Sequence, residues 1–439
     1  MSCPAVCRTV TMIDSHVHLD HAAFSGDLEE VLARAVEDGV SAVVNVGYDR
    51  ESARATAAFV DRYPFFFGIV GTHPHDASKH NVDYENELKD LLDRPRILGV
   101  GEVGLDYYYD HSPRDVQRDV FRRMLRLSRL KDKPVVIHCR DAAEDALEIL
   151  SSERIQFRGV FHAFNGDAAM ALRVTELGFH LGIGGVATYK NSKLVEILRA
   201  IPLERIVLET DSPYLAPHPF RGRRNEPSLL WFVVKTLSEV HGVAPAEIVR
   251  RTTDNFCSAL HLERGALPSP VYKIGKKVYI HTPPASDQGG WLAGLAVEAA
   301  ESGPTEEAVL CGLDEPLENL EHVFACAGSL KPKGVPVRLL TRGAGGVERD
   351  VFRELSGLVD VMTVRMGGCT AAQDEKVRGK VAGEETLDTL VDFVRRSIAA
   401  GIATECLFVA VPKMKLEPCE ALAEQLGAAY SVRKYRPLE

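Results

Sequence analysis

Residues 96–104 read RILGVGEVG, an apolar and glycine-rich run that contains one carboxylate, Glu102. Seven comparable runs lie between residues 11 and 211, and segments with apolar residues at helical spacing, such as 27–38 and 115–131, separate them. Strands that are apolar on both faces and alternate with helices are typical of a parallel sheet. The other runs are TMIDSHV (11–17), SAVVNVG (41–47), PFFFGIVG (64–71), PVVIHC (134–139), GVFHAF (159–164), GFHLGIGG (178–185) and RIVLETD (205–211).

Eight strand–helix units in about 250 residues predict an α/β fold that begins with a TIM (β/α)8 barrel. We place this barrel at residues 12–264, with closing helices at 226–262. A doubly wound open sheet is the alternative, but it does not require reactive side chains at the ends of so many strands. GALPSP (265–270) predicts a linker, because it holds two prolines, a glycine and small residues.

The alternation resumes in residues 271–439 and predicts a second α/β domain, a partial (β/α)6 barrel. Segments with helical spacing, including 289–301, 317–330, 385–400 and 417–426, separate its strands. The strand candidates are KKVYIH (276–281), AVLCGL (308–313), VPVRLLT (335–341), DVMTVRM (360–366), ECLFVAV (405–411) and AAYSVRKY (428–435).

The composition, 45% hydrophobic and 26% charged, is that of a water-soluble globular chain. No apolar run approaches the roughly 20 residues that cross a bilayer, so no membrane association is expected. The net charge of −10 argues against a protein that coats nucleic acid, and any phosphate binding must be local. Nine scattered cysteines predict free thiols in a reducing, cytoplasmic compartment. Residues 1–11 lack a signal-peptide core, and we expect a disordered lead or a misassigned start before Met12.

Six side chains that can bind metal fall where predicted strands give way to polar residues. That edge is the active-site face of a parallel barrel, so residues distant in sequence converge there. Taken singly, each has a structural alternative: a hydrogen-bonded histidine, a buried salt bridge for Glu102, or a helix N-cap for Asp211. Their joint placement favours a metal site, and Asp14 is expected to orient a ligand. The six are His16, His18, Glu102, His138, His162 and Asp211.

Four histidines and two carboxylates can hold two divalent ions, with one carboxylate as a bridge. These ligands suit Zn²⁺, Mn²⁺ or Mg²⁺ alike. Two adjacent ions would activate water and stabilise the attacking and leaving oxygens, which suits phosphodiester hydrolysis and equally amide or lactone hydrolysis. Further polar side chains at these strand ends favour a phosphate, although Arg223 and Arg224 also fit a solvated loop. The predicted phosphate-binding residues are His73, His75, Arg140, Arg221 and Asn225.

Over residues 12–262 the chain resembles the TatD family of metal-dependent deoxyribonucleases in the amidohydrolase superfamily. The motifs are DSHVHLD (14–20), GTHPHD (71–76), GEVGLDYYYD (101–110), VVIHCRDA (135–142), HAFNG (162–166) and ETDSPYLAPHPFRGRRNEP (209–227). The resemblance implies that Glu102 bridges two ions and that Asp211 is both a ligand and the general base. One ion would be held by His16, His18, Glu102 and Asp211, and the other by Glu102, His138 and His162.

Members of the TatD family are typically 3′–5′ exonucleases on DNA, and some act on RNA or aminoacyl-tRNA. The family commonly has Cys and Ser where this chain has Ala163 and Asn165. Neither residue is an expected ligand, so these departures bear on substrate preference and leave the metal site intact.

The second domain resembles radical S-adenosylmethionine domains over two short motifs. VYKIGKKVYIHT (271–282) is similar to the start of such domains, and LCGLDEPLENL (310–320) to their Gly-Glu-Pro stretch. These domains need a C-x3-C-x2-C loop after the first strand, but HTPPASDQGG (281–290) contains no cysteine. We therefore expect a degenerate domain without a [4Fe–4S] cluster. It either binds a partner, a nucleotide or the barrel, or persists for stability alone.

The leading prediction is a metal-dependent hydrolase, a nuclease that removes nucleotides from the 3′ end of single-stranded DNA or RNA. Asp211 and Glu102 are its predicted catalytic residues, and Arg140 and Arg221 would hold the phosphate. One alternative is an amide or ester hydrolase at the same metal site, for example an aminoacyl-tRNA deacylase. The other is a non-catalytic scaffold with a relict site, against which the intact ligand set argues.

Overall fold

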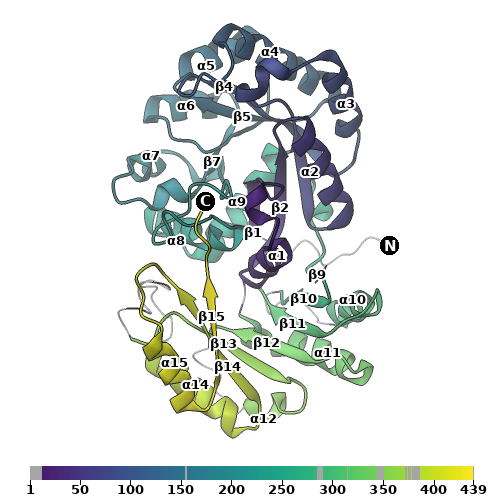
Figure 1. Ribbon diagram of the computed structural model, residues 1–439, viewed down its shortest axis with the longest axis vertical. Helices are drawn as coiled ribbons and strands as arrows, with labels where there is room; N and C mark the ends of the chain where they lie inside the picture. The colour runs from purple at the N-terminus through teal and green to yellow at the C-terminus, as the bar shows by residue number, and fades with distance from the viewer. Residues whose placement is uncertain are drawn as a thin grey trace. The chain divides into compact units, whose positions relative to one another are not determined.

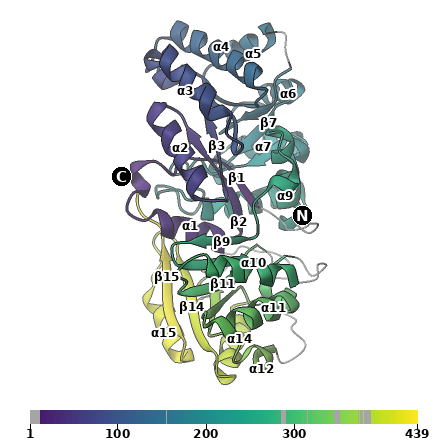
Figure 2. The same ribbon diagram turned by 90° about the vertical axis from the view of Figure 1, so that its right-hand side faces the viewer.

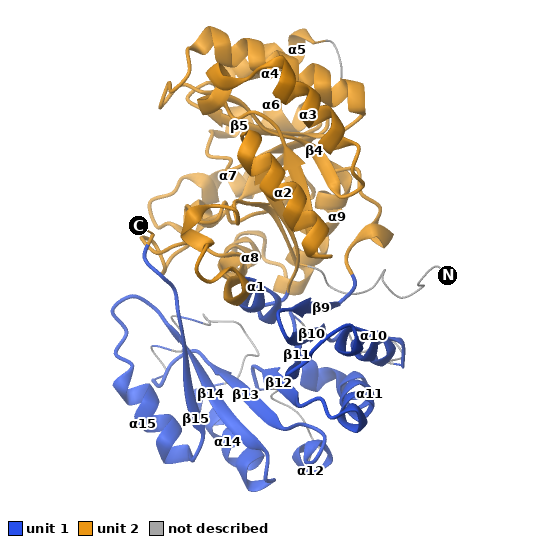
Figure 3. Ribbon diagram, turned by 45° about the vertical axis from the view of Figure 1, so that its right-hand side comes forward, with its two compact units in different colours: residues 1–10, 32–39, 269–437 blue, residues 11–31, 40–268, 438–439 orange. Residues whose placement is uncertain are grey.

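The computed structural model describes residues 12–153, 156–283, 290–313, 315–343, 351–370, 373, 377 and 386–438. The predicted lead at residues 1–11 and most of the loop at 281–290 lie outside the described residues. The chain divides into two compact units (Figure 3). The barrel unit comprises residues 11–31, 40–268 and 438–439, and the C-terminal unit comprises residues 1–10, 32–39 and 269–437.

The barrel unit contains an eight-stranded sheet whose strands follow one another in sequence order, all parallel (Figure 1). This arrangement confirms the predicted TIM barrel. Most of these strands are wholly buried, which explains their apolar sequences. The strands are β1 (Met12–Val17), β2 (Val40–Gly47), β3 (Phe66–Val70), β4 (Ile97–Asp106), β5 (Val135–Arg140), β6 (Gly159–Phe161), β7 (His180–Ile183) and β8 (Ile206–Leu208).

Helices connect successive strands and cover the outside of the sheet, with α2 and α3 beside β2 and β3 (Figure 2). Local sequence fixes several helix ends. Asp49 and Ser52 form a reciprocal capping box at the start of α2, and Pro245 begins α9. The helices are α1 (Leu28–Glu37), α2 (Arg50–Arg62), α3 (Val82–Leu92), α4 (Arg114–Lys131), α5 (Ala143–Ser152), α6 (Ala168–Glu176), α7 (Leu194–Ala200), α8 (Leu230–His241) and α9 (Pro245–Ala259). Among the described residues, none of the helices combines the length and the apolar character that a membrane span requires.

The C-terminal unit contains a seven-stranded mixed sheet in the order β15-β14-β13-β12-β11-β10-β9. Its six parallel strands, β10 to β15, match the six predicted strand candidates, and β9 is an additional antiparallel strand that the prediction omitted. The strands are β9 (Val271–Ile274), β10 (Lys277–His281), β11 (Glu307–Cys311), β12 (Val337–Thr341), β13 (Val361–Met366), β14 (Ala403–Ala410) and β15 (Ala429–Lys434). The helices are α10 (Gly290–Glu301), α11 (Leu320–Leu330), α12 (Val351–Leu355), α14 (Leu387–Ala399) and α15 (Glu417–Leu426).

The two faces of this second sheet differ in polarity, because side chains alternate along each strand. Apolar residues such as Leu310 and Leu339 form a buried core with the helices. On the opposite face, Arg338 binds Glu307 at 2.9 Å and Thr363 at 2.7 Å. Charged networks therefore cover the face that this apolar core leaves out.

Residues 32–39 belong to the C-terminal unit although they lie early in the chain. Nε2 of His281, at the end of β10, donates a hydrogen bond to the Val36 carbonyl at 2.6 Å. Arg433 on β15 contacts both carboxylate oxygens of Asp38 at 2.7 Å and Glu37 at 2.6 Å. The end of α1 is thus bound to the carboxyl ends of strands in this sheet.

Candidate metal centre

Closure of the barrel fixes the position of the first predicted ligands. His16 lies in β1, and His18 directly follows the last residue of that strand, Val17. The amide of His18 donates to the Ser212 carbonyl at 2.8 Å, and the amide of Asp211 donates to the His16 carbonyl at 2.9 Å. A parallel bridge between Val17 and Ser212 also joins these segments. The first strand and the segment after β8 therefore hold two histidines and a carboxylate side by side.

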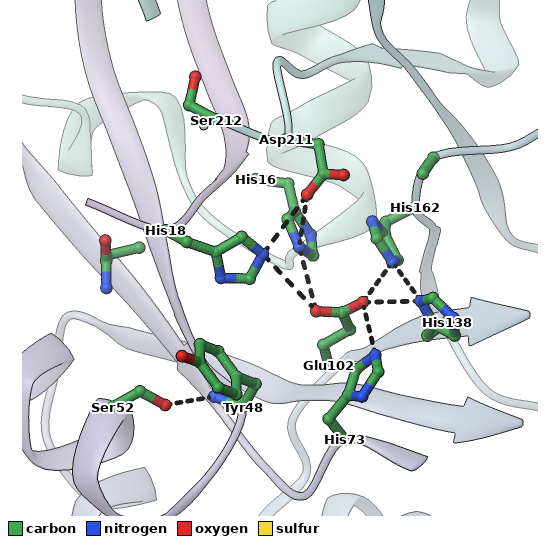
Figure 4. A network of polar contacts seen from close by, with 12 residues as sticks. His16, His18, Tyr48, Ser52, His73, Glu102, His138, His162, Asp211 and Ser212 are labelled. Atoms are coloured by element: carbon green, nitrogen blue, oxygen red, sulfur yellow. Dashed lines mark hydrogen bonds and ion pairs between the residues drawn. The ribbon is translucent and has the colours of Figure 1, made fainter. Parts of the chain in front are cut away.

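Glu102, in β4, is the central residue of the cluster (Figure 4). Its two carboxylate oxygens face two different sets of imidazole rings. Oε1 lies 2.6 Å from Nε2 of His162, 2.8 Å from Nδ1 of His138 and 3.4 Å from Nε2 of His73. Oε2 lies 3.5 Å from Nε2 of His16 and 3.8 Å from Nε2 of His18.

Asp211 completes the second of these sets. Its Oδ1 lies 3.4 Å from Nε2 of His18 and 3.8 Å from Nε2 of His16. The structure therefore brings together all six side chains that the sequence indicated as ligands. It also adds His73, which we predicted only as a phosphate contact.

The donor atoms of this cluster fit divalent metal ions. His16 is fully buried, and neither of its ring nitrogens has a hydrogen-bond partner among the described residues. The same holds for Nδ1 of the buried ring of His162. Unpaired buried nitrogens are costly unless another group satisfies them, and metal coordination does so. Three groups have potential ligand atoms within 4.8 Å of one another: His16, His18 and Glu102; His73, Glu102 and His138; His16, His162 and Glu209.

The environment of the cluster keeps Glu102 ionised and two histidines neutral. Burial alone would raise the pKa of Glu102, but the surrounding rings, His162 first, hold it well below its ordinary value. Burial lowers the pKa of His16 to about 4 and that of His73 to about 4. A carboxylate beside neutral imidazoles is the protonation state that metal binding requires.

Two other histidines of the cluster have raised pKa values. Burial opposes the charged form of both rings, but Asp211 beside His18 and Asp106 beside His138 outweigh it and raise each pKa to about 9. Metal coordination by these two rings would therefore release protons.

Asp106, at the end of β4, is a functional residue that the sequence analysis missed. Its Oδ2 lies 2.9 Å from Nε2 of His75 and 3.2 Å from Nε2 of His138. Its Oδ1 accepts the backbone amides of Tyr108 and Tyr109 at 3.0 and 2.9 Å. Its position in GLDYYYD, at the end of a strand, was the available signal. Asp106 positions a ligand ring through its second nitrogen, as carboxylates commonly do around metal sites.

Glu209 is the second residue that the sequence analysis missed. It is fully buried beside His16 and His162, and one of its oxygens accepts the Ala163 amide. Burial raises its pKa well above the ordinary value. Glu209 thus adds a carboxyl group, whose protonated form is favoured, at the edge of the cluster.

The predicted phosphate-binding residues differ in placement. His73 and His75 lie at the cluster, and Arg140 follows the ligand His138 by two residues at the end of β5. Arg221 is exposed, and its guanidinium lies over the ring of Tyr189 at 4.8 Å.

Two neighbouring residues of the loop after β8 have structural roles instead. Asn225 is fully buried, and its amide donates to the Thr210 carbonyl at 2.7 Å. Arg224 is also buried, and it binds both oxygens of Asp27 at 2.8 Å. Because both side chains are buried, neither is on the surface where a phosphate would bind.

Asp14 contacts the backbone of the cluster: its Oδ1 accepts the His16 amide at 3.4 Å, and its expected role in orienting a ligand stays a prediction. Its Oδ1 accepts the Thr210 amide at 2.9 Å, and its Oδ2 accepts the Thr210 hydroxyl at 2.6 Å. The carboxylate therefore fixes the strand end that precedes Asp211.

A parallel barrel with histidines and carboxylates gathered at one end of its strands defines the class of metal-dependent hydrolases. The family model for TatD related DNase matches residues 13–261, and the chain belongs to this family. Residues 271–439 lie outside that match, and their predicted likeness to radical S-adenosylmethionine domains stays a prediction.

Similar proteins include YabD of Bacillus subtilis, a metal-dependent hydrolase of uncharacterized function. It is 38% identical over 246 residues, which cover 56% of this chain and 96% of YabD. YcfH of Escherichia coli K12 is 34% identical over 264 residues, which cover 59% of this chain and 98% of YcfH. The crystal structure of the TatD homologue YjjV of Escherichia coli K12 aligns with a TM-score of 0.55 and 29% identity. That alignment covers 59% of this chain and all of YjjV.

Proposed function

We propose that this metal-dependent hydrolase is a 3′–5′ exonuclease that acts on single-stranded DNA and uses two divalent ions, Mg²⁺, Mn²⁺ or Zn²⁺. The observation that carries the proposal is the position of Glu102. One of its oxygens faces His138 and His162, and the other faces His16 and His18. A carboxylate shared in this way is suited to bridge two ions.

Each ion would be held by its own set of side chains. One ion would be held by His16, His18, Glu102 and Asp211. The other would be held by Glu102, His138 and His162, and His73 lies beside these three. Ions at such a site supply Lewis acidity, which activates water and stabilises charge on phosphate oxygens.

Asp211 is the proposed general base. Burial alone would raise its pKa, but the hydrogen bond from His18 and the nearby His16 lower it, so the carboxylate is ionised at neutral pH. It would accept a proton from the attacking water while a new phosphorus–oxygen bond forms. The bond between phosphorus and the 3′ oxygen breaks, and the 3′ oxygen takes up a proton from solvent water. The products are a nucleoside 5′-phosphate and a strand with a new 3′ hydroxyl group.

A phosphate substrate is supported by the position of Arg140. Its exposed guanidinium lies close in the chain to His138, and it has no carboxylate partner among the described residues. A fixed positive charge beside a dinuclear site suits a phosphodiester better than a neutral amide or ester.

The test is digestion of single-stranded oligonucleotides labelled at either end, with each of the three metals. We expect a ladder from the 5′-labelled strand and immediate release of a labelled mononucleotide from the 3′-labelled strand. Glu102→Gln should abolish both, and Leu130→Ala, at an exposed position of α4, should change neither. Hydrolysis of an aminoacyl ester with no cleavage of DNA would contradict the proposal, and so would the absence of any hydrolysis by metal-loaded protein.

A further inference from the structure

A cleft with a volume of about 880 Å³ lies in the barrel unit. Cys139 and Arg140, which directly follow His138, line it together with Tyr107, Tyr108 and Asn165. The ends of three neighbouring strands, β4, β5 and β6, thus contribute to one surface. The proposed exonuclease reaction does not use most of these side chains.

Tyr108, which lines the cleft, and its neighbour Tyr109 form a pair of exposed tyrosines. Tyr108 is 58% exposed and Tyr109 is 49% exposed, and their ring centroids are 4.8 Å apart at right angles. Tyr109 also lies parallel to His111 at 5.4 Å and edge-on to His75 at 5.4 Å. Aromatic rings therefore continue from the histidines of the metal centre out to solvent.

The turn that carries these tyrosines is fixed to the metal centre. Asp106 accepts the amides of Tyr108 and Tyr109 with one oxygen and contacts His138 with the other. The rings consequently have a defined position relative to the ligands, although they are exposed. Binding to such a preorganised surface costs less conformational entropy.

Arg140 differs from the other arginines of the cleft. Arg118 binds Asp145 at 2.9 Å, and Arg173 binds Glu144. Arg140 has no such carboxylate among the described residues, and its guanidinium lies 4.0 Å from the ring centroid of Tyr108 and 4.8 Å from that of Tyr109. Its charge is held in place by aromatic contacts and is available to an anion.

We propose that Tyr108, Tyr109 and Arg140 form a subsite for an unpaired nucleotide of the substrate strand, where a base stacks on the aromatic surface and Arg140 binds the adjoining phosphate. Exposed aromatic rings next to a lone cation are the usual means of binding single strands without sequence preference. In a duplex the base faces are covered by neighbouring bases. This subsite thus selects single strands, and the inference rests on the proposed function.

The test is binding of a fluorescent oligothymidylate with phosphorothioate linkages, measured by anisotropy in EDTA so that no cleavage occurs. A strand of the same length built from abasic residues keeps the phosphates and removes the bases. Tyr108→Ala should weaken binding of the oligothymidylate about five-fold or more and leave binding of the abasic strand unchanged. Tyr108→Phe and Leu130→Ala should bind both strands as the unaltered protein does, whereas Arg140→Met should weaken both.

An equal loss of affinity for both strands in Tyr108→Ala would overturn the stacking subsite, and so would unchanged affinity for the oligothymidylate. Thermal melting of each variant identifies any that is not folded, and Tyr109→Ala then provides a second test of the base-dependent loss. Digestion of unmodified DNA separates this inference from the function on which it rests. Cleavage without any dependence on Tyr108 would contradict the subsite alone, whereas base-dependent binding without cleavage would contradict the exonuclease alone.

Discussion

Asp106 and His138 are joined through the side of the imidazole that faces away from Glu102. Oδ2 of Asp106 lies 3.2 Å from Nε2 of His138, while Nδ1 of the same ring lies 2.8 Å from Glu102. The ring is thereby held between two carboxylates of β4, and its Nδ1 points to the centre of the cluster.

Replacement of Asp106 by Asn should impair the centre without unfolding the protein. The amide cannot supply the charge that orients and polarises His138, and losses of about 10- to 100-fold in metal affinity or activity are typical. Metal titration and kcat would measure both effects. Asp61→Asn, which removes an exposed partner of Arg94, is the matched control and should change neither. Unchanged metal affinity and kcat in Asp106→Asn would show that His138 needs no such support.

Glu102→Gln should remove bound metal and activity together, because it takes away the charge that both sets of histidines face. Elemental analysis of the purified variant would measure metal content. Asp211→Asn should lower turnover more than metal content, since the loss of the general base adds to the loss of one ligand. A fully active Glu102→Gln protein would refute the bridging assignment.

Arg224→Met should destabilise the barrel by about 3–5 kcal/mol, because it removes the buried cation that contacts the carboxylates of Asp27 and Glu226. Denaturant unfolding would measure the loss. Arg223→Met, one position earlier and less buried, serves as the control. An effect on KM without any loss of stability would instead place Arg224 at the substrate.

Acidification should destabilise the C-terminal unit through His281. Burial lowers the pKa of its ring to about 4, although the hydrogen bond to Val36 acts in the opposite direction. Between pH 6.5 and 4 the unfolded chain binds a proton at this ring and the folded chain does not, so stability falls as the pH falls. The contribution is at most about 3 kcal/mol.

His281→Gln keeps a donor for the Val36 carbonyl and cannot titrate. Its free energy of unfolding, measured from pH 7 to pH 4, should decline less steeply than that of the unaltered protein. Parallel curves for the two proteins would show that folding does not lower the pKa of this ring.

The barrel could be predicted from sequence, and each of the six candidate ligands that the structure brings together has a local signal. His16 and His18 are two residues apart at the end of a strand, and Glu102 interrupts an apolar run. Such signals depend only on the strand's own geometry, which explains why the sequence alone indicated that these six side chains lie close together.

The residues that escaped prediction depend on neighbours from other strands. The link from Asp106 to His138 exists because β4 and β5 pair in one register, with Asp106 opposite Arg140. The placement of Asn225 inside the protein depends on the Thr210 carbonyl, which sequence spacing does not reveal. The prediction also omitted β9, which is defined by its antiparallel pairing with β10 across a short turn.

The end of α1 has a consequence for dividing this protein. Glu37 and Asp38 form ion pairs with Arg365 and Arg433, which lie more than three hundred residues later in the chain. A chain that ended at Gly265 would lack the counter-ions of both carboxylates. A single recombination point in the linker would likewise transfer only one half of the network. Point substitution in the second half therefore leaves the partners of Glu37 and Asp38 in place, whereas its deletion does not.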